Sequence, residues 1–280
     1  MREPGRLYLC ATPIGNLDDV SFRLLDTLRH VDLVAAEDTR VTAKLLTKYG
    51  IRKPAVSFNE HNARTRVTSL IQALLSGRDV ALLSDAGTPG ISDPGVQLVR
   101  EAVQHGLRVT AIPGPTAFVV GLVLSGLDTR RFLFEGFLPK NRSERARRLE
   151  QLKDVPYTLV FYEAPHRLKE TLESLLDVLG NRKAAMAREL TKIHEEVVRG
   201  TLKEISDTVS PDIKGEITLV VEGAGPRSDT PVGQFAGIVA SFVAEGVDRK
   251  TACRIISKAF GISSRALYND SLERDALAKK

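Results

Sequence analysis

Apolar positions along the chain fall into short continuous runs and into longer runs with helical spacing. Leu7–Ala11 and Asp79–Leu83 are short and largely apolar, which is typical of strands buried on both faces of a sheet. Between such runs, stretches like Ser21–Arg29 and Ala63–Leu75 place their apolar residues on one helix face. Because strands and helices alternate, the first part of the chain is predicted to form an α/β domain with a mostly parallel sheet.

This pattern changes twice farther along the chain. The predicted strands Phe132–Phe137 and Tyr157–Tyr162 flank a basic helix, and shorter connections between the later strands indicate a mixed sheet. A linker of sequence GAGPRSDTP follows, and after it only helices are predicted, with Thr251–Ala259 and Ser263–Leu272 at helix-turn-helix spacing around Gly261. We therefore predict two α/β domains and a small helical extension, with boundaries at 1–125, 126–226 and 231–280.

Composition narrows the class of protein. The chain has 280 residues, 42% of them hydrophobic, and a net charge of +5, which fits a folded globular protein. Its two cysteines, Cys10 and Cys253, both lie in apolar runs and are too few for a disulfide framework. The longest apolar run, Thr116–Leu127, is shorter than the roughly 20 residues that a membrane-spanning helix needs. We expect a soluble, cytoplasmic protein that does not enter a membrane.

Three glycine- and proline-rich loops follow predicted strands. Ser84–Gly95 has the sequence SDAGTPGISDPG, Pro113–Ala117 the sequence PGPTA, and Ala11–Asn16 the sequence ATPIGN. Carboxyl ends of parallel strands meet at one edge of a sheet, where ligands of doubly wound folds bind. Each loop alone could be an ordinary turn before a helix. Their coincidence at one edge predicts a ligand cleft.

Several common cofactor and catalytic motifs are absent from the sequence. It contains no GxGxxG, GxxxxGK[ST], HExxH, CxxC or GxSxG segment, so the standard dinucleotide, P-loop and zinc-protease sites are excluded. Its five histidines form no i, i+4 pair. We expect no metal site.

Clusters of polar residues follow other predicted strands. Glu37–Arg40 (EDTR) and Asn59–Asn62 (NEHN) offer carboxylates beside a guanidinium or an imidazole. An aspartate in such a place also commonly caps the next helix, and both interpretations stay open. A third charged feature is the stretch 140–153 (KNRSERARRLEQLK), which contains six basic and two acidic residues. It is either a solvated helix face or a surface for RNA phosphates.

Seven segments occur together in a recognisable order: TPIGNLDD, AAEDTR, SFNEHN, LLSDAGTPGISDPG, IPGPTA, FYEAPHR and ARELTKIHEE. This series resembles the tetrapyrrole methylase family, and within it the bacterial enzymes that methylate the ribose 2′-hydroxyl of a decoding-centre cytidine in 16S rRNA. The match covers roughly residues 6–225, and the helical tail is similar to an extension found in those proteins. The resemblance implies two α/β domains that enclose S-adenosylmethionine, a homodimer, and 16S rRNA or the small ribosomal subunit as partner.

The resemblance also implies which residues hold the methyl donor. Pro13 is expected beside the methionine part of the donor, and the loop after the fourth strand is expected to bind it. The second domain is expected to close over the adenosine. The complete expected set comprises Pro13, Asp85, Ala86, Gly87, Thr88, Thr116, Ala117, Tyr162, Glu163, Arg188 and Leu190.

Transfer of a methyl group to a hydroxyl requires alignment of the two reactants and loss of the hydroxyl proton. Candidates for the proton acceptor are Glu37, Asp38 and Glu60, with His61 as an alternative and Arg40 as an anchor for a phosphate or carboxylate. The basic stretch supplies candidate RNA contacts at Arg142, Arg145, Arg147 and Arg148.

Two other functions remain open at the level of the sequence. One is a methylase that acts on a small tetrapyrrole, although a small substrate needs neither the basic stretch nor the helical tail. The other is a nucleic-acid-binding regulator without enzymatic activity, whose α/β part would sense a ligand.

Overall fold

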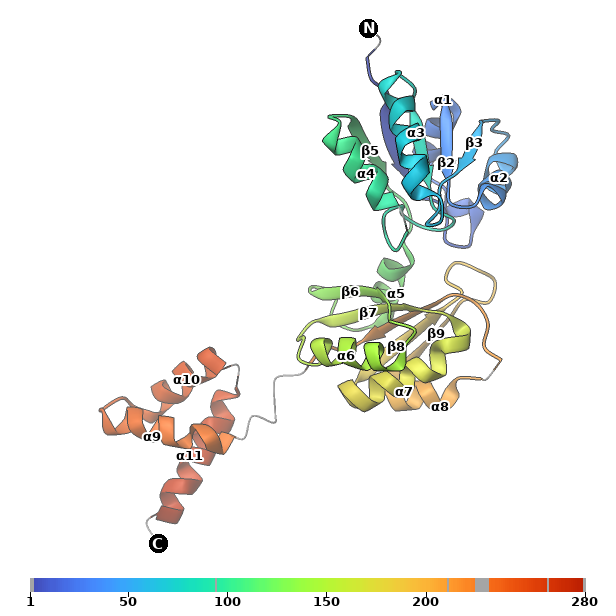
Figure 1. Ribbon diagram of the computed structural model, residues 1–280. Coiled ribbons are helices and arrows are strands. Elements are labelled where there is room, and N and C mark those ends of the chain that lie inside the picture. The colour runs from blue at the N-terminus through green and yellow to red at the C-terminus, as the bar shows by residue number, and fades with distance from the viewer. Residues whose placement is uncertain (1–2, 94, 211, 225–231, 261, 279–280) are drawn as a thin grey trace.

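The structure, a computed structural model, describes residues 3–93, 95–210, 212–224, 232–260 and 262–278 (Figure 1). In this part of the chain, two α/β units follow one another, and three α-helices with one short 3-10 helix form the C-terminal unit (Figure 1). The predicted fold class is thereby confirmed.

The first sheet has the strand order β3-β2-β4-β1-β5, and every neighbouring pair is parallel. Tyr8 of the central strand pairs with Ala81 on one side and with Thr110 on the other. The parallel prediction is therefore correct. The strands are β1 (Arg6–Cys10), β2 (Leu33–Ala36), β3 (Ala55–Ser57), β4 (Val80–Leu83) and β5 (Arg108–Ile112).

Helices cover both faces of this sheet because its strands carry apolar side chains on both faces. On β4, Ala81 and Leu83 pack with one pair of helices, whereas Val80 and Leu82 pack with the other pair. Such two-sided burial explains the continuous apolar run at this strand. The first pair is α1 (Phe22–His30) and α2 (Thr39–Lys48), and the second pair is α3 (Ala63–Leu75) and α4 (Gly95–Gln104).

The second sheet is mixed, as predicted. Its order is β6-β7-β10-β8-β9, in which β6 and β7 are parallel and the other neighbours are antiparallel. The strand β6 lies at one edge and has a register shift between Phe134 and Gly136. The strands of the second sheet are β6 (Phe132–Phe137), β7 (Thr158–Glu163), β8 (Lys183–Arg188), β9 (Glu196–Thr201) and β10 (Ile217–Val221).

One face of the second sheet packs against three helices whose leucines and isoleucine form its main core. These helices are α6 (Arg142–Leu152), α7 (Leu168–Leu179) and α8 (Leu202–Thr208). Asn141 caps α6 by accepting hydrogen bonds from the amides of Ser143 and Glu144. Two short 3-10 helices complete the α/β part, η1 (Leu17–Asp19) and η2 (Pro165–Arg167).

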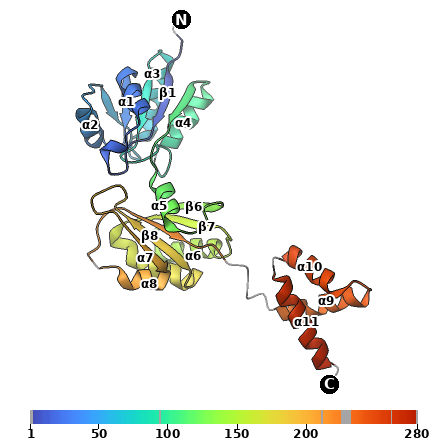
Figure 2. The same ribbon diagram turned by 180° about the vertical axis from the view of Figure 1, so that it is seen from behind.

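The other face of the second sheet is covered by α5 (Ala117–Ser125), the link between the two α/β units (Figure 2). Leu122 packs with Val160, Ala185 and Val220 of this sheet. α5 therefore packs with the second sheet, whereas the boundary predicted near residue 125 places it in the first domain; we propose that the boundary lies before α5. The sequence alone does not show which sheet this helix packs against. Because α5 is apolar on all sides, its pattern does not indicate which of its faces is buried. None of the described helices has both the length and the apolar character needed to cross a membrane.

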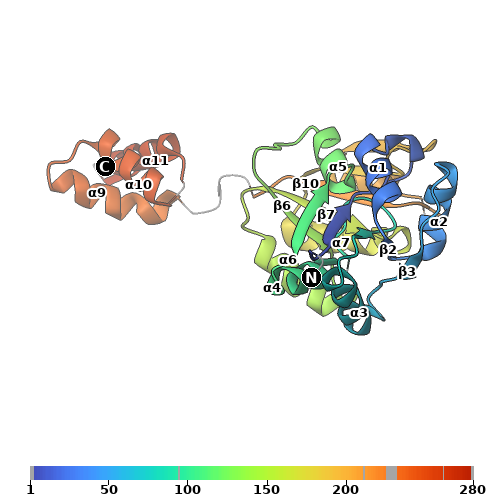
Figure 3. The same ribbon diagram turned by 90° about the horizontal axis from the view of Figure 1, so that it is seen from above.

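The C-terminal unit consists of η3 (Val232–Phe235), α9 (Ala236–Ala244), α10 (Arg249–Phe260) and α11 (Ser264–Ala278) (Figure 3). Val239, Cys253, Ile256 and Leu267 form its core. The two predicted helices around the turn are therefore present. Gly261, on which the helix-turn-helix interpretation depends, lies outside the described residues, as does most of the predicted linker.

Candidate active site

A cavity of about 400 Å³ lies between the two α/β units. Its first wall consists of Ile14 after β1, Glu37 after β2, seven residues after β4, and Thr116 and Ala117 after β5. The seven are Ser84, Ala86, Gly87, Thr88, Ile91, Ser92 and Asp93. The predicted convergence of three loops on one cleft is therefore confirmed. Its second wall comes from the second sheet and is formed by Phe137, Tyr162, Glu163, Ala164, Pro165, Leu190, Gly215, Glu216, Ile217 and Thr218.

Backbone hydrogen bonds join the loops of the first wall. The amide of Thr12 donates to the carbonyl of Gly87 over 2.9 Å, and the amide of Gly87 donates back to Thr12 over 3.1 Å. The Thr12 hydroxyl donates to the carbonyl of Ser84. Gly87 has a φ of +81°, a conformation that glycine adopts without a steric penalty. The glycine thus lets the backbone itself form the surface of the cavity.

Two side-chain interactions order the same loops. The hydroxyl oxygens of Thr88 and Thr116 are 2.7 Å apart and join the loop after β4 to the start of α5. The carboxylate of Asp93 accepts hydrogen bonds of 2.8 Å from the amides of Gly90 and Gly95. Burial raises the pKa of Asp93. Asp93 therefore holds the loop in shape from within.

Glu37 is the predicted proton acceptor that reaches the cavity wall. Its carboxylate accepts a 3.1 Å hydrogen bond from the amide of Asp85, and the carboxylate of Asp85 accepts one of 2.9 Å from the amide of Asp38. Burial is the main cause that raises the pKa of both carboxyl groups. Asp85 supports the wall without lining the cavity.

The other predicted catalytic residues lie outside the described cavity wall. Asp38 caps α2 by accepting from the amide of Arg40, which is the structural alternative left open by the sequence. It also forms an ion pair of 2.6 Å with the exposed Arg40, whose hydrogen bond lowers the pKa of Asp38 to about 2. Glu60 and His61 are exposed in the loop after β3.

The second wall uses side chains more than backbone. The Tyr162 hydroxyl accepts a 3.1 Å hydrogen bond from the amide of Phe118, and burial raises the pKa of Tyr162. The buried carboxylate of Glu163 accepts from the amide of Ala164 and from the hydroxyl of Thr171. Because its oxygens are used within the protein, Glu163 stabilises the wall.

Three of the residues expected to bind the donor do not line the cavity: Asp85, described above, and also Pro13 and Arg188. Pro13 is buried beside Ile14, which lines it instead. Arg188 forms a 2.9 Å ion pair with Glu196 and donates to the carbonyl of Lys214. Leu190, two residues later, does line the cavity.

Some residues of the cavity wall were not predicted from the sequence: Phe137 and the segment Gly215–Thr218, both on the second wall. Ligands of parallel sheets bind at the carboxyl ends of strands, whereas Gly215–Thr218 lies at the beginning of β10. In the mixed sheet β10 runs antiparallel to β7, so the beginning of β10 faces the same edge as the end of β7. The abrupt change from Lys214-Gly215 to the apolar run Ile217–Val221 was the available signal.

Acidic groups dominate the electrostatics of the cavity. Four acidic residues line it, Glu37, Asp93, Glu163 and Glu216, whereas its described lining contains no lysine, arginine or histidine. Two of them are paired with cations outside the lining, Glu163 with Arg167 and Glu216 with Lys192. A cavity lined by one sign of charge favours a ligand of the opposite sign. Among the residues that the structure describes, no group of three or more His, Cys, Asp or Glu is arranged to hold a metal ion.

The basic stretch, now α6, divides into two kinds of arginine. Arg142 and Arg147 are exposed, and neither forms an ion pair with the rest of the described chain. Arg148 forms a 2.6 Å ion pair with Glu135. Arg145 has no exposed surface and bonds to Glu170. The predicted RNA contact of Arg145 is therefore wrong for this structure, because a buried and fully bonded guanidinium cannot reach a phosphate.

Comparison with known proteins gives a consistent result. Residues 6–206 match the family of tetrapyrrole (corrin/porphyrin) methylases. A protein named Ribosomal RNA small subunit methyltransferase I from Halalkalibacterium halodurans is 45% identical over 273 residues, which are 95% of this chain and 94% of the relative. The protein of the same name from Mesorhizobium japonicum is 48% identical over 274 residues, which are 97% of this chain and 92% of the relative.

Solved structures share the fold at low sequence identity. Uroporphyrin-III C-methyltransferase from Thermus thermophilus, complexed with S-adenosylhomocysteine, has a TM-score of 0.55 and 20% identity, covering 77% of this chain and 97% of that structure. Diphthine synthase has a TM-score of 0.59 and 14% identity, covering 78% of this chain and 89% of that structure. At such identities the likeness concerns the fold alone.

Proposed function

This chain belongs to the tetrapyrrole methylases and, within them, to the family of ribosomal RNA small subunit methyltransferase I, and we propose that it methylates the ribose 2′-hydroxyl of a decoding-centre cytidine in 16S rRNA. As a member of this family it is an S-adenosylmethionine-dependent methyltransferase. The observation that carries the proposal is the acidic cavity between the two α/β units.

The residues present fit the methyl donor. A volume of about 400 Å³ lies within the range of roughly 300–1,000 Å³ for small-molecule sites. The donor is cationic at its sulfonium, and the carboxyl groups of the described lining complement that charge. Ala86, Gly87 and Thr88 would hold it from the first wall, together with Thr116 and Ala117. Tyr162 and Leu190 would hold it from the second wall.

The protein's contribution to the reaction is positioning and removal of one proton. The donor, when bound, would supply an activated methyl group, whose bond to sulfur would be exchanged for a bond to the ribose oxygen. Alignment of the two reactants by the cavity walls can supply on the order of 7–11 kcal/mol. Glu37, which lines the cavity and has a pKa raised by burial, would accept the hydroxyl proton. A raised pKa makes it a better base than an ordinary glutamate.

RNA binding would use the exposed cations near the cavity. Arg142 and Arg147 on α6, and Lys140 before it, are exposed without an ion pair in the described chain. Phosphate contacts by such side chains make affinity fall steeply with salt. Arg148, paired with Glu135, would contribute less. The assembled small subunit or free 16S rRNA would be the partner, and the cytoplasm the compartment.

We also propose a homodimer. Val119 and Val123 of α5 are 45% and 65% exposed on the helix that covers the second sheet. Exposed apolar side chains that share a helix are typical of a protein interface. Sedimentation velocity at micromolar concentration tests this state, for which a monomer at all concentrations would be the contrary result.

The two alternatives have weaker support. A tetrapyrrole substrate carries several carboxylates and would need cationic side chains, which are absent from the described cavity lining. A sensor without activity does not explain why a carboxylate with a raised pKa lines the cavity.

Labelled S-adenosylmethionine and unmodified small ribosomal subunits provide the test. The purified protein should transfer label to one cytidine of 16S rRNA, and the bond after that nucleotide should resist alkaline hydrolysis because its 2′-oxygen is blocked. Label in a base, in ribosomal protein or in no RNA at all would contradict the proposal.

A further inference from the structure

Phe137, the last residue of β6, is a large apolar side chain that is 55% exposed and yet lines the cavity. One side of its ring is supported by Tyr162, with ring centroids 5.6 Å apart and planes tilted by 55°. Phe134, on the same strand, is instead stacked on Phe118 at 4.4 Å and partly buried. Phe137 therefore presents a supported but uncovered aromatic surface beside the donor cavity.

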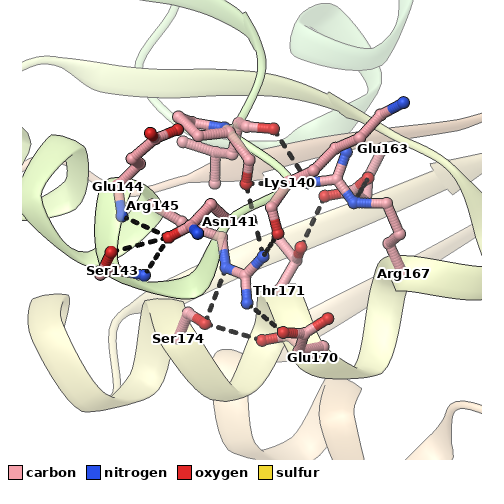
Figure 4. A network of polar contacts seen from close by, with 12 residues as sticks. Lys140, Asn141, Ser143, Glu144, Arg145, Glu163, Arg167, Glu170, Thr171 and Ser174 are labelled. Carbon is pink, nitrogen blue, oxygen red and sulfur yellow. Dashed lines mark hydrogen bonds and ion pairs between the residues drawn. The ribbon is translucent and has the colours of Figure 1, made fainter.

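The turn that follows Phe137 is held by two arginines (Figure 4). Arg145 donates from Nη1 to the carbonyls of Pro139 and Lys140, over 3.4 and 3.2 Å. Arg167 donates from Nη2 to the carbonyls of Leu138 and Pro139, over 2.9 and 3.2 Å. Each of the three carbonyls in the turn thus accepts a hydrogen bond from a guanidinium.

Both guanidiniums are themselves fixed. Arg145 is fully buried, donates to the hydroxyl of Ser174 over 3.0 Å and forms an ion pair with Glu170 (Figure 4). The side chain of Arg167 is 12% exposed and lies 3.6 Å from the carboxylate of Glu163. Burial of charge is costly unless the groups are paired, and a simple surface turn does not require it. This clamp, defined as Arg145 and Arg167 on the carbonyls of residues 138–140, rigidly positions the segment that begins at Phe137.

Exposed cations come next in the chain. Lys140 lies in the clamped turn, and Arg142 begins α6. An aromatic surface next to cations that can meet phosphates is the combination by which proteins bind unpaired nucleotides. Methylation of a ribose inside a folded RNA also requires access to the nucleotide, which enzymes commonly obtain by taking its base out of the stack.

We propose that Phe137 stacks on the nucleobase of the acceptor nucleotide, and that Arg145 and Arg167 are positioning residues that hold it there. The inference rests on the proposed function and names the part of the substrate that this side of the cavity receives. Because Phe137 is 55% exposed, it can receive a base that enters from outside the cavity.

Replacement of the ring is the direct test. Phe137→Leu keeps an apolar side chain but removes the aromatic surface, and Phe137→Trp retains one. We expect Phe137→Leu to raise KM for small subunits about tenfold, the loss of one stacking contact, with kcat and the affinity for S-adenosylhomocysteine within about twofold of the original protein. Phe137→Trp should restore KM. Phe132→Leu, at the other end of β6 and 42% exposed, is the matched control outside the described cavity lining.

A fluorescent cytidine analogue at the acceptor position of an RNA fragment gives a second readout. Its emission should be quenched by the original protein and by Phe137→Trp, but not by Phe137→Leu. Lower affinity for S-adenosylhomocysteine with unchanged KM for RNA would overturn the inference and assign the ring to the donor. Dissociation of a dimer would assign it to a protein interface, and unchanged constants would remove any role. Failure of the original protein to methylate rRNA would instead refute the proposed function.

The clamp is tested by Arg167→Lys, which keeps the positive charge but loses the planar guanidinium that donates to the carbonyls of Leu138 and Pro139. If the clamp acts through Phe137, this change raises KM for RNA severalfold, and combining it with Phe137→Leu adds little further loss. Additive effects in the double variant would overturn the positioning role. Thermal unfolding of each variant identifies any general loss of structure.

Discussion

The two walls of the cavity are built from different materials. The first wall consists largely of loop backbone, joined by the reciprocal hydrogen bonds of Thr12 and Gly87. The second wall presents side chains at strand ends, above all Phe137 and Tyr162. A backbone surface approaches a small ligand closely, and few substitutions preserve its conformation. A side chain at a strand end can be substituted without moving the backbone around it. We therefore expect changes in the first wall to affect the donor and the chemistry, and changes at Phe137 and at the exposed cations of α6 to affect RNA.

The largest effect should follow removal of the first wall's carboxylate. Glu37→Gln keeps the shape and can still accept from the amide of Asp85, but it cannot take up the hydroxyl proton. Single-turnover methylation should fall by about 10²- to 10⁴-fold with little change in donor affinity. Glu60→Gln is the matched comparison, since Glu60 is exposed in the loop after β3. A larger loss in Glu60→Gln than in Glu37→Gln would transfer the role to Glu60.

A second strong effect should follow a change of backbone conformation. Gly87→Val places a β-branched residue at a φ of +81° and should reduce the affinity for S-adenosylhomocysteine about a hundredfold, because the loop must move to relieve the strain. Gly106→Val provides the control, since Gly106 has a φ of +67° and no atom near the position of a Cβ. Calorimetry should find it less stable but normal in binding. Equal affinities in the two variants would argue against a backbone-built donor site.

The two walls also differ, for a physical reason, in how far the sequence predicts them. The first wall follows parallel strands, whose carboxyl ends always share an edge, so the amino-acid sequence alone was enough to place Ser84–Gly95 and Pro113–Ala117 there. The second wall depends on the direction of β10 in a mixed sheet, which local sequence does not reveal. Gly215–Thr218 was missed for that reason.

Long-range pairing also limits what a charge pattern can tell. Arg142, Arg145, Arg147 and Arg148 look equivalent in the sequence of α6. The burial of Arg145 depends on Glu170 and Ser174 of α7, more than twenty residues away, and no local periodicity identifies such partners. Charge runs predict a basic surface, but not which of its members are exposed.

A smaller effect, on RNA alone, should follow removal of two exposed cations in the second α/β unit. The double variant Arg142→Ala, Arg147→Ala should bind small subunits about tenfold more weakly and reduce the slope of log affinity against log salt by about 1.5. Arg29→Ala, Arg78→Ala removes the same charge before β2 and β4, at the opposite edge of the first sheet. An identical slope for both double variants would show a general charge effect and no specific surface.

The smallest effect concerns pH. Glu37 must be ionised to accept a proton, and burial raises its pKa, so the methylation rate should fall as pH drops through a value above the ordinary glutamate pKa. Protonated Glu37 favours the folded state; this stabilisation is present at low pH and is lost as pH rises through the raised pKa. Glu37→Gln should therefore not lower the melting temperature at pH 7. A lower melting temperature for Glu37→Gln at pH 7 would indicate that the main role of the carboxylate is to stabilise the folded protein.

Titration of the full-length protein with S-adenosylhomocysteine in a calorimeter tests the central claim most directly. We predict saturable heat with one ligand per chain, which Gly87→Val abolishes at the same concentrations while Gly106→Val retains it. Protein that is folded by circular dichroism and yet gives no heat, or gives the same heat in both glycine variants, would contradict the assignment of the donor to this cavity.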